Sequence, residues 1–305
     1  MMKSRIKKIG NKKKYNYTAY LWLLPAFVLI LLFSGYPLIN AFILSFTNSN
    51  GQGYGNFVGF ANYVELFQDK VFWICMKNVA IFTLVGILCG NFMTIFLAEL
   101  LFNFKAKKTS AIFRILFILP VLVPFVVILL VWQNIIFSKT GLINQIIMAS
   151  GGEAINWYYS SPSDFFAIIA TNFPWVGGTS FLIYLAGLQG INRGVLEACE
   201  MDGICGVKRV FKIDLPLIKG QLKYFLIMGV IGGLQNFDLQ LIITGSGPGT
   251  SNSVNVPGLY LYDWAWGGTL SDQSRYGYAS AIGVMIFIFT MGFAILNNRK
   301  PKAEK

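Results

Sequence analysis

The sequence contains no histidine among its 305 residues. Histidine is the side chain that titrates near neutral pH and a common zinc ligand, so Ser-His catalysis, histidine general bases and histidine-ligated metals are excluded. The four cysteines, at positions 75, 89, 199 and 205, form no Cys-x-x-Cys pair. We therefore expect neither a disulfide framework nor a metal site, and we interpret the cysteines as small buried thiols.

Charge is also scarce. Only 12% of the residues are charged, whereas 55% are hydrophobic and 27 are phenylalanine. A soluble domain carries about 25% charged residues. The deficit indicates that lipid, rather than water, surrounds most of this chain. The sequence also lacks a Gly-x-x-x-x-Gly-Lys-Ser/Thr loop and has no Gly-Lys dipeptide, so it has no ATP-binding loop of that kind and we expect no enzymatic site.

Long apolar runs dominate what is present. Each reaches or approaches the roughly 20 residues that a helix needs to cross a bilayer. Because only helices satisfy their backbone in lipid as single segments, the sequence predicts an all-α polytopic membrane protein with six transmembrane helices. The first run is too long for a signal peptide and is interpreted as an uncleaved helix. The six runs are 19–46, 79–102, 111–137, 165–188, 224–244 and 278–296.

The cations indicate the orientation. If the N-terminus is cytoplasmic, all but four of the 25 lysines and arginines fall on the cytoplasmic side. This bias predicts a cell-membrane protein with both termini in the cytoplasm: a basic tail of residues 1–18, a six-helix domain of 19–297 and a C-terminal tail of 298–305. It also explains the net charge of +12, because most of these cations would contact lipid headgroups or water. No nucleic-acid partner is needed to account for the charge. The four outer cations are Lys70, Lys77, Lys139 and Arg275.

The outer connections, 47–77, 138–164 and 245–277, are rich in aromatic residues. Such residues suit a membrane-interface belt or short amphipathic helices that lie on the membrane. A ligand platform is the alternative interpretation. The aromatic residues concerned are Trp73, Trp157, Tyr158, Tyr159, Trp264 and Trp266.

One compact polar segment interrupts the apolar chain between the fourth and fifth runs: "EACEMDGICGVKRVFKIDLP", residues 197–216. We expect a two-turn helix over 195–202, a break at Gly203 and Gly206, and a second helix that Pro216 ends. In the second helix, Val207, Val210, Phe211 and Leu215 would form an apolar stripe, while Lys208, Arg209 and Lys212 face away. Such a helix either lies at the lipid interface or docks into a groove of a cytoplasmic partner.

The spacing of this segment resembles the EAA loop of permease subunits of ATP-binding-cassette (ABC) importers. Glu197-Ala198-Cys199 is followed by Gly203 and then by Ile213-x-Leu215-Pro216. Further stretches resemble the carbohydrate branch, the maltose and glycerol-phosphate type permeases, so that the resemblance covers about 17–297. These stretches are "FVGFANYVELFQDKVFW" (57–73), "TGLINQII" (140–147), "LAGLQGI" (185–191) and "TGSGPGT" (244–250). Two departures are Cys199 in place of the second alanine and Gly220 where proline is common.

The resemblance implies a type I importer permease of MetI-like fold, which forms half of the translocation pathway and binds no cofactor itself. It implies a second permease subunit, a cytoplasmic ABC ATPase dimer that binds the ATP, and an extracytoplasmic solute-binding protein. The loop, residues 189–219, would couple to the ATPase, with Glu197 paired to an Arg or Lys and residues 200–213 seated in its groove. The coupling residues would be Glu197, Ala198, Cys199, Asp202, Gly203, Phe211, Ile213, Leu215 and Pro216.

Polar residues inside the apolar runs are candidates for the substrate pathway. "QNFD" (235–238) interrupts the fifth run, and an intramembrane carboxylate such as Asp238 is by default functional. The alternative is a buried Asp satisfied by neighbouring hydroxyls or amides. Amides and an aromatic ring suit a polyhydroxylated ligand, so a sugar or oligosaccharide is favoured. The predicted pathway residues are Gln235, Asn236, Asp238, Asn172, Trp175 and Asn134, and Asn91 and Gln133 add further amides.

Two other function classes compete with this interpretation. A six-helix secondary transporter or channel would need ion-coupling carboxylates or inverted repeats. The sequence shows one deep acid and no clear repeat, and such a protein would leave the EAA-like loop unexplained. A membrane enzyme is disfavoured because the sequence has no histidine and no paired-carboxylate motif.

Overall fold

The computed structural model describes residues 17–104, 106–173, 178–244, 253–267 and 274–297. Within these ranges every regular element is a helix, apart from one isolated antiparallel bridge between Thr47 and Phe57. The predicted all-α fold is therefore confirmed.

Four of the predicted apolar runs form helices that are long and apolar enough to cross a membrane: Tyr20–Leu44, Lys70–Phe102, Lys219–Ile243 and Tyr276–Asn297. The first contains α1 (Tyr17–Ile30), a π-helical turn η1 (Leu31–Gly35) and α2 (Tyr36–Leu44). The second is α4 (Lys70–Phe102), which begins earlier than predicted, and the last is α16 (Tyr276–Asn297). The remaining one divides into α13 (Lys219–Gln235) and α14 (Asp238–Thr244), so the predicted interruption at 235–238 is confirmed.

The third predicted run is not one straight helix. It contains α5 (Lys107–Ile118), the 3-10 turn η2 (Leu119–Leu122), α6 (Phe125–Val131) and the π-helical turn η3 (Trp132–Ile136). The two halves meet at an angle of 88°. Pro124 explains the bend because it disfavours helical geometry in the residue before it, and Pro120 contributes because it lacks a backbone N–H to continue the hydrogen bonds of α5. Val123 is accordingly extended, with φ −84° and ψ 124°.

The fourth predicted run is divided as well. It forms α8 (Ser163–Thr171) and α9 (Gly178–Gln189), each too short to cross a membrane by itself. Residues 174–177, in the middle of the predicted run, lie outside the described residues. The described residues thus contain four spanning helices and one bent pair, so the third predicted run is bent, and the fourth predicted span stays a prediction.

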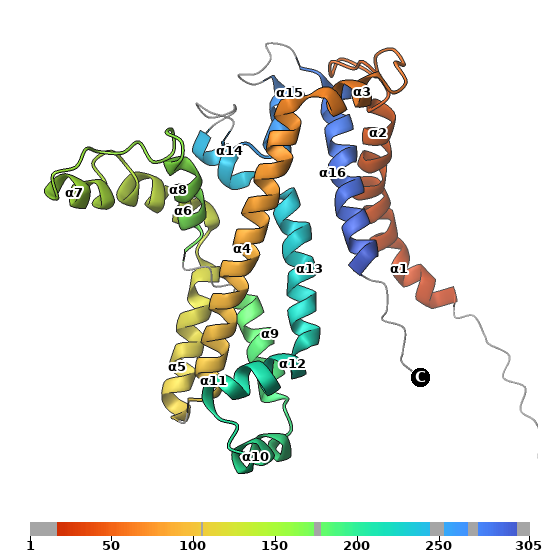
Figure 1. The fold of residues 1–305 in the computed structure, drawn as a ribbon. Helices are drawn as coiled ribbons and strands as arrows, with labels where there is room; N and C mark the ends of the chain where they lie inside the picture. The colour runs from red at the N-terminus through yellow and green to blue at the C-terminus, as the bar shows by residue number, and fades with distance from the viewer. Residues whose placement is uncertain (1–16, 105, 174–177, 245–252, 268–273, 298–305) are drawn as a thin grey trace, which may run out of the picture.

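Helix α4 is the centre of the packing and runs beside α13 along most of the molecule (Figure 1). Its last turns pack with α9 around the buried Tyr184 and Leu188. Glycines on α13 let the two helices approach closely, since a Cβ at Gly229 would lie 2.8 Å from Cγ1 of Ile87 and one at Gly233 would collide with Thr83. Close packing is the expected use of such a Gly-x-x-x-Gly pair, and it is confirmed here.

The remaining helices lie at the two ends and one side of α4 (Figure 1). Helices α3 (Ala61–Gln68) and α15 (Pro257–Trp266) lie at the end where α4 begins. The helices of the polar segment lie at the opposite end, and α6, α8 and α7 (Leu142–Ala149) project to one side.

Two sequence expectations need correction. Tyr158 is only 4% exposed and packs in a hydrophobic cluster, so it belongs neither to an interface belt nor to a ligand platform. Cys75 and Cys199 are buried as expected and Cys89 is half-buried, but Cys205 is exposed because it lies in the turn just before the second helix of the polar segment.

Candidate functional site

The polar segment (residues 189–219) folds as two helical parts separated by a glycine turn. The first part is α10 (Arg193–Met201), and the second contains α11 (Gly206–Arg209), the π-helical turn η4 (Val210–Asp214) and α12 (Leu215–Leu217). The side chain of Asn192 begins α10 by accepting a hydrogen bond of 2.9 Å from the backbone N–H of Gly194. The turn uses positive φ angles of 67° at Gly203 and 56° at Gly206, which side chains disfavour. The predicted break at these glycines is confirmed.

An open groove of about 450 Å³ lies between α10 and η4. Four of the predicted coupling residues line it: Ala198, Cys199, Asp202 and Ile213. Glu197 is exposed beside Ala198 on α10, and Met201, at 89% exposure, ends the helix. The polar segment therefore presents a concave surface with an acidic residue next to it.

The second part of the segment differs from its predicted amphipathic pattern. Val207 and Phe211 are 73% and 67% exposed, while the side chain of Arg209 is turned inward and only 14% exposed. Pro216 does not end the helix, because it lies in the first turn of α12, where proline is tolerated, and the chain continues into α13. Leu215, the first residue of α12, is half-buried. Apolar side chains thus face outward at the end of the molecule, and a cation faces inward.

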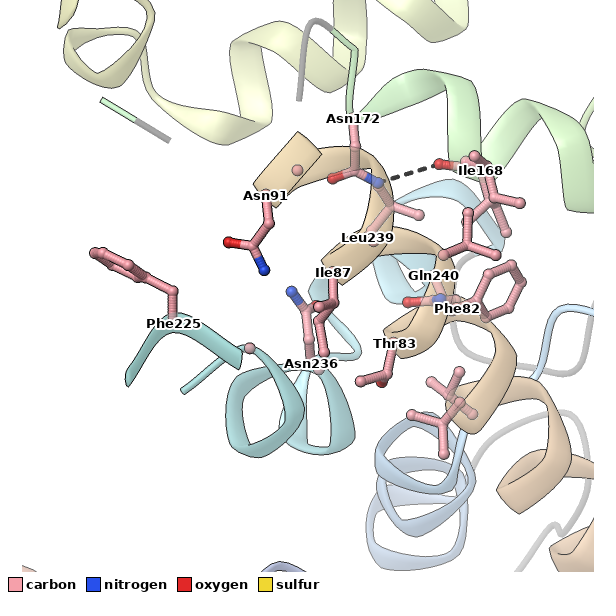
Figure 2. A pocket seen from close by; sticks show the side chains of 18 of the residues that line it. Phe82, Thr83, Ile87, Asn91, Ile168, Asn172, Phe225, Asn236, Leu239 and Gln240 are labelled. Carbon is pink, nitrogen blue, oxygen red and sulfur yellow. Dashed lines mark hydrogen bonds between the residues drawn. The ribbon is translucent and has the colours of Figure 1, made fainter. Parts of the chain in front are cut away.

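A second hollow lies between the helices beside the middle of α4. It is a cavity of about 440 Å³ lined by α4, α8, α9, α13 and α14, within the size range of small-molecule sites (Figure 2). Among the described residues that line it, none is charged. The polar lining consists of Thr83, Asn91, Thr94, Asn172, Ser180, Asn236 and Gln240.

The predicted pathway residues fall into three groups. Asn236 and Asn172 line the cavity. Gln235, Asp238 and Asn134 are outside its lining, and Trp175 lies outside the described residues. Asp238 is exposed in the first turn of α14, so the alternative of a buried Asp is wrong. Asn134 is exposed and donates to the Leu130 carbonyl at 3.0 Å.

The cavity also contains Asn91, one of the further amides that the sequence indicated, and Thr83 and Gln240, which the sequence interpretation missed. Asn91 accepts a hydrogen bond of 3.0 Å from the Tyr184 hydroxyl through Oδ1, and its amide end points toward that of Asn236 (Figure 2). The Oγ1 atom of Thr83 is buried without a hydrogen-bond partner among the described residues. Thr83, Ile87 and Asn91 recur every four residues, so they share one face of α4, and this spacing was available in the sequence. No comparable spacing in the sequence points to Gln240.

Asn236 reaches the cavity because the backbone there is not helical. Its φ of −78° and ψ of 128° are extended, and α13 ends one residue earlier. The break places a polar side chain against α4 at the height of Thr83 and Asn91 (Figure 2). Where a helix breaks inside a membrane, its backbone is tolerated when it borders a polar cavity.

A polar cluster fixes the other end of α4. Asp69 caps the helix by accepting from the backbone N–H of Val71 at 2.8 Å, and it also accepts from the hydroxyls of Tyr260 and Tyr278, the latter at 2.7 Å. Burial raises the pKa of Tyr260, so its hydroxyl remains a donor. These contacts join α4 to α15 and α16.

Two more ionisable groups lie nearby. Arg275 makes two hydrogen bonds of 2.6 Å to the carboxylate of Glu65, and this hydrogen bonding raises the pKa of the guanidinium. Asp263 of α15 is fully buried, and neither carboxylate oxygen has a hydrogen-bond partner among the described residues. Burial raises the pKa of Asp263 from 3.8 to about 6.

Comparison with known proteins gives consistent results over nearly the whole chain. The chain is 30% identical over 289 residues to the probable ABC transporter permease protein YurN of Bacillus subtilis, covering 94% of this chain and 96% of that protein. It is 30% identical over 298 residues to the lactose transport system permease protein LacF of Rhizobium radiobacter, covering 96% and 97%. The fold matches a chain of a bacterial alginate ABC transporter solved with a pentasaccharide-bound periplasmic protein, with a TM-score of 0.79, 22% identity and 96% coverage of both chains.

A family model also matches residues 83–300, which is more than half of the chain and includes both the cavity and the polar segment. Its members are described as the binding-protein-dependent transport system inner membrane component. The alternatives of a secondary transporter, a channel and a membrane enzyme are therefore set aside. The chain belongs to this family and is the multi-pass inner-membrane permease subunit of an ABC importer, not its ATPase.

Proposed function

We propose that this permease carries a neutral sugar or oligosaccharide across the inner membrane through the cavity beside α4, and that the polar segment couples this movement to a cytoplasmic ATPase. The cavity carries the substrate part of the proposal. Its amides, hydroxyls and the Phe82, Phe125 and Phe225 rings offer hydrogen bonds and stacking surface, and its described lining holds no charge. A polyhydroxylated neutral ligand needs both kinds of contact.

The names of similar proteins agree with this substrate class. Besides the lactose permease protein, similar proteins include a trehalose/maltose permease protein of Thermococcus litoralis and an arabinooligosaccharide permease protein of Bacillus subtilis. The alginate transporter imports an acidic polysaccharide. The neutral lining of the cavity favours an uncharged sugar over a uronate here.

The polar segment carries the coupling part of the proposal. Its groove, the exposed Glu197 and the exposed Met201, Val207 and Phe211 form an acidic and apolar surface at one end of the molecule. Exposed apolar side chains next to a charged group are typical of a protein–protein contact. The partner would be the ABC ATPase dimer, with an Arg or Lys paired to Glu197. A position at the lipid interface is the alternative.

The remaining partners follow from the exposed faces of the molecule. The most apolar stretch of the first span has no buried residue within this chain, so it would lie against lipid or against a second, paralogous permease subunit. In our orientation both termini and the polar segment are cytoplasmic, and α3 and α15 face the extracytoplasmic solute-binding protein. The bias of the cations supports this orientation.

The substrate proposal is tested by Asn236→Ala in the assembled transporter, reconstituted in proteoliposomes with its binding protein and a panel of labelled sugars. Removing one neutral hydrogen bond is expected to lower uptake of the cognate neutral sugar by about threefold to tenfold. The matched control is Gln235→Ala, which removes an amide outside the cavity lining and should leave uptake unchanged. Equal uptake by both variants, or preferential uptake of a uronate, would reject the assignment.

A further inference from the structure

The polar segment is joined in two different ways to α13 and α4, two neighbouring helices that both line the cavity. It continues into α13 through the chain itself, from α12 by way of the buried Ile218. It reaches α4 through the side chain of Arg209. The following inference concerns that second connection and rests on the coupling role proposed above.

Arg209 contacts both its own segment and the end of α4. Its Nε donates to Oδ2 of Asp214 at 2.9 Å, and its Nη2 donates to Oδ1 of Asn103 at 2.5 Å. Its guanidinium carbon also lies 5.6 Å from the centre of the Phe102 ring. The planar guanidinium can serve both acceptors at once because its donors point in different directions, which a lysine cannot reproduce.

The contact on α4 lies where a cation is favoured. Phe102 is the last residue of α4 and Asn103 is its C-cap, so the positive charge of Arg209 stands at the negative end of the helix dipole. The Asn103 amide is held on its other side, because Nδ2 donates to the Glu99 carbonyl at 2.8 Å and approaches Oε2 of Glu99 at 3.4 Å. Arg209, Asn103 and Glu99 therefore form a chain of polar contacts from the polar segment into the last turn of α4.

This cluster holds more acceptors than donors. Asp214 is fully buried and Glu99 is 6% exposed, yet one oxygen of each carboxylate, Oδ1 and Oε1, has no hydrogen-bond partner among the described residues. The guanidinium of Arg209 bonds Asp214 directly and reaches Glu99 only through Asn103. Because a fully satisfied buried polar network is rigid, the two unpaired oxygens leave this connection less tightly fixed.

We propose that Arg209 is a positioning residue that ties the polar segment to α4, so that a displacement of the segment moves α4 and α13 together. Helix α4 carries Thr83 and Asn91 on the cavity wall. Helix α13 packs against α4 through Gly229 and Gly233, which also line the cavity. Without Arg209, the segment would act on α4 only through apolar packing, by way of α13 and of the buried cluster of Ile218, Ala98 and Leu101. With Arg209 in place, movement at the cytoplasmic end reaches both walls of the cavity.

The test uses Asn103→Ala in the complete transporter with its ATPase and binding protein, reconstituted in proteoliposomes. Asn103 is exposed, and the Arg209–Asp214 ion pair stays intact in this variant, so the charges remain balanced. The measurement is the number of sugar molecules imported per ATP hydrolysed. Loss of one hydrogen bond to a charged group is expected to lower this ratio by about tenfold, while ATP hydrolysis and the amount of co-purified ATPase stay within about twofold.

Arg209→Lys is the second variant, because it keeps the charge beside Asp214 but lacks the planar fork, and it should lower the ratio in the same way. Lys219→Gln is the matched control, since it removes one exposed cation from the same segment and should leave the ratio unchanged. An unchanged ratio in both Asn103→Ala and Arg209→Lys would overturn the proposal. Sugar import and ATP hydrolysis that fall in parallel with the yield of complex would also overturn it, because the role would then be structural. Failure of the proposed function has a different signature, in which the unaltered permease assembles and transports without any ATPase bound.

Discussion

The two ends of α4 are both polar, but the carboxylates that bind there are satisfied to different degrees: Asp69 is bonded through both oxygens, although the neighbouring Asp263 is not. At the first end, Asp69 accepts four hydrogen bonds that join three helices, two of them from the backbone N–H groups of Val71 and Phe72 in the first turn of its own helix. At the last end, Arg209 bonds Asp214 directly and Glu99 only through Asn103, and each carboxylate leaves an oxygen unpaired among the described residues. A fully satisfied network is rigid, whereas one with unpaired acceptors is less tightly fixed. We therefore interpret the first end as an anchor and the last end as the moving connection.

The largest effect is expected where the polar segment meets its partner. Gly203 has a φ of 67°, which proline cannot adopt because its ring fixes φ near −65°. Gly203→Pro should displace α10 from η4, close or distort the groove, and abolish sugar import. Glu197→Lys should also abolish sugar import, because it places a lysine against the Arg or Lys of the ATPase that we propose as the partner of Glu197. Import and ATPase co-purification in reconstituted complexes measure the effect, with Gly220→Ala as a control outside the turn.

Both variants leave the spanning helices untouched, so membrane insertion should be normal. Normal import by inserted Gly203→Pro and Glu197→Lys permeases that still hold the ATPase would show that the segment is only an interfacial helix. A single exposed ion pair contributes only about 0.2–1 kcal/mol, so Glu197→Ala is a weaker test than charge reversal.

The anchor end should respond in stability rather than in coupling. Asp69→Ala removes the N-cap of α4, which costs about 1 kcal/mol, and leaves the hydroxyls of Tyr260 and Tyr278 without their acceptor, which costs about 1–3 kcal/mol more for each buried group. The thermal midpoint of the purified permease should fall clearly. In complexes that survive, the ratio of sugar imported to ATP hydrolysed should stay normal. A normal midpoint with a reduced ratio would reverse our assignment of the two ends.

A smaller effect with a defined pH dependence is expected at Asp263. Because its folded pKa is raised to about 6, the folded state binds the proton more tightly, and stability is lost as the pH rises from 3.8 through 6. Between pH 4.5 and 7.5 this group should lower the free energy of unfolding by roughly 2 kcal/mol. Asp263→Asn should abolish that part of the dependence and stabilise the protein most at pH 7.5. The measurement is the thermal midpoint of both proteins across this pH range. If the midpoints of Asp263→Asn and wild type differ by a constant amount at every pH, burial does not raise the pKa of Asp263.

Local sequence signals predicted the parts of the fold that depend on neighbouring residues. Gly203 and Gly206 predicted the turn in the polar segment, the cysteine-containing helix of 195–202 corresponds to α10, and the interruption at 235–238 is present. Pro120 and Pro124 also carried enough information to predict the bend between α5 and α6, but the run was interpreted by hydropathy alone.

The rest depended on contacts between distant parts of the chain. Arg209 was placed outward with Lys208 and Lys212, because helical periodicity assigns every cation of a short amphipathic helix to the solvent side. Its partner Asn103 lies more than a hundred positions earlier, so no local pattern reveals the inward contact. The same holds for the cavity, where Asn236 and Asn172 were predicted from polarity, while Asp238, the most conspicuous polar residue, lies outside it.

Site-specific cross-linking between the polar segment and the ATPase tests the central claim most directly. Cysteine is introduced at Met201, which is 89% exposed at the end of α10, in a permease whose own four cysteines are replaced, since Cys205 is exposed and would react. We predict a cross-link from position 201 to the ATPase subunit in transport-competent complexes, with an efficiency that changes when ATP is added. A complex that transports sugar but gives no such cross-link, while cysteine at position 201 reacts freely with a small thiol reagent in the presence and absence of ATP, would contradict the account.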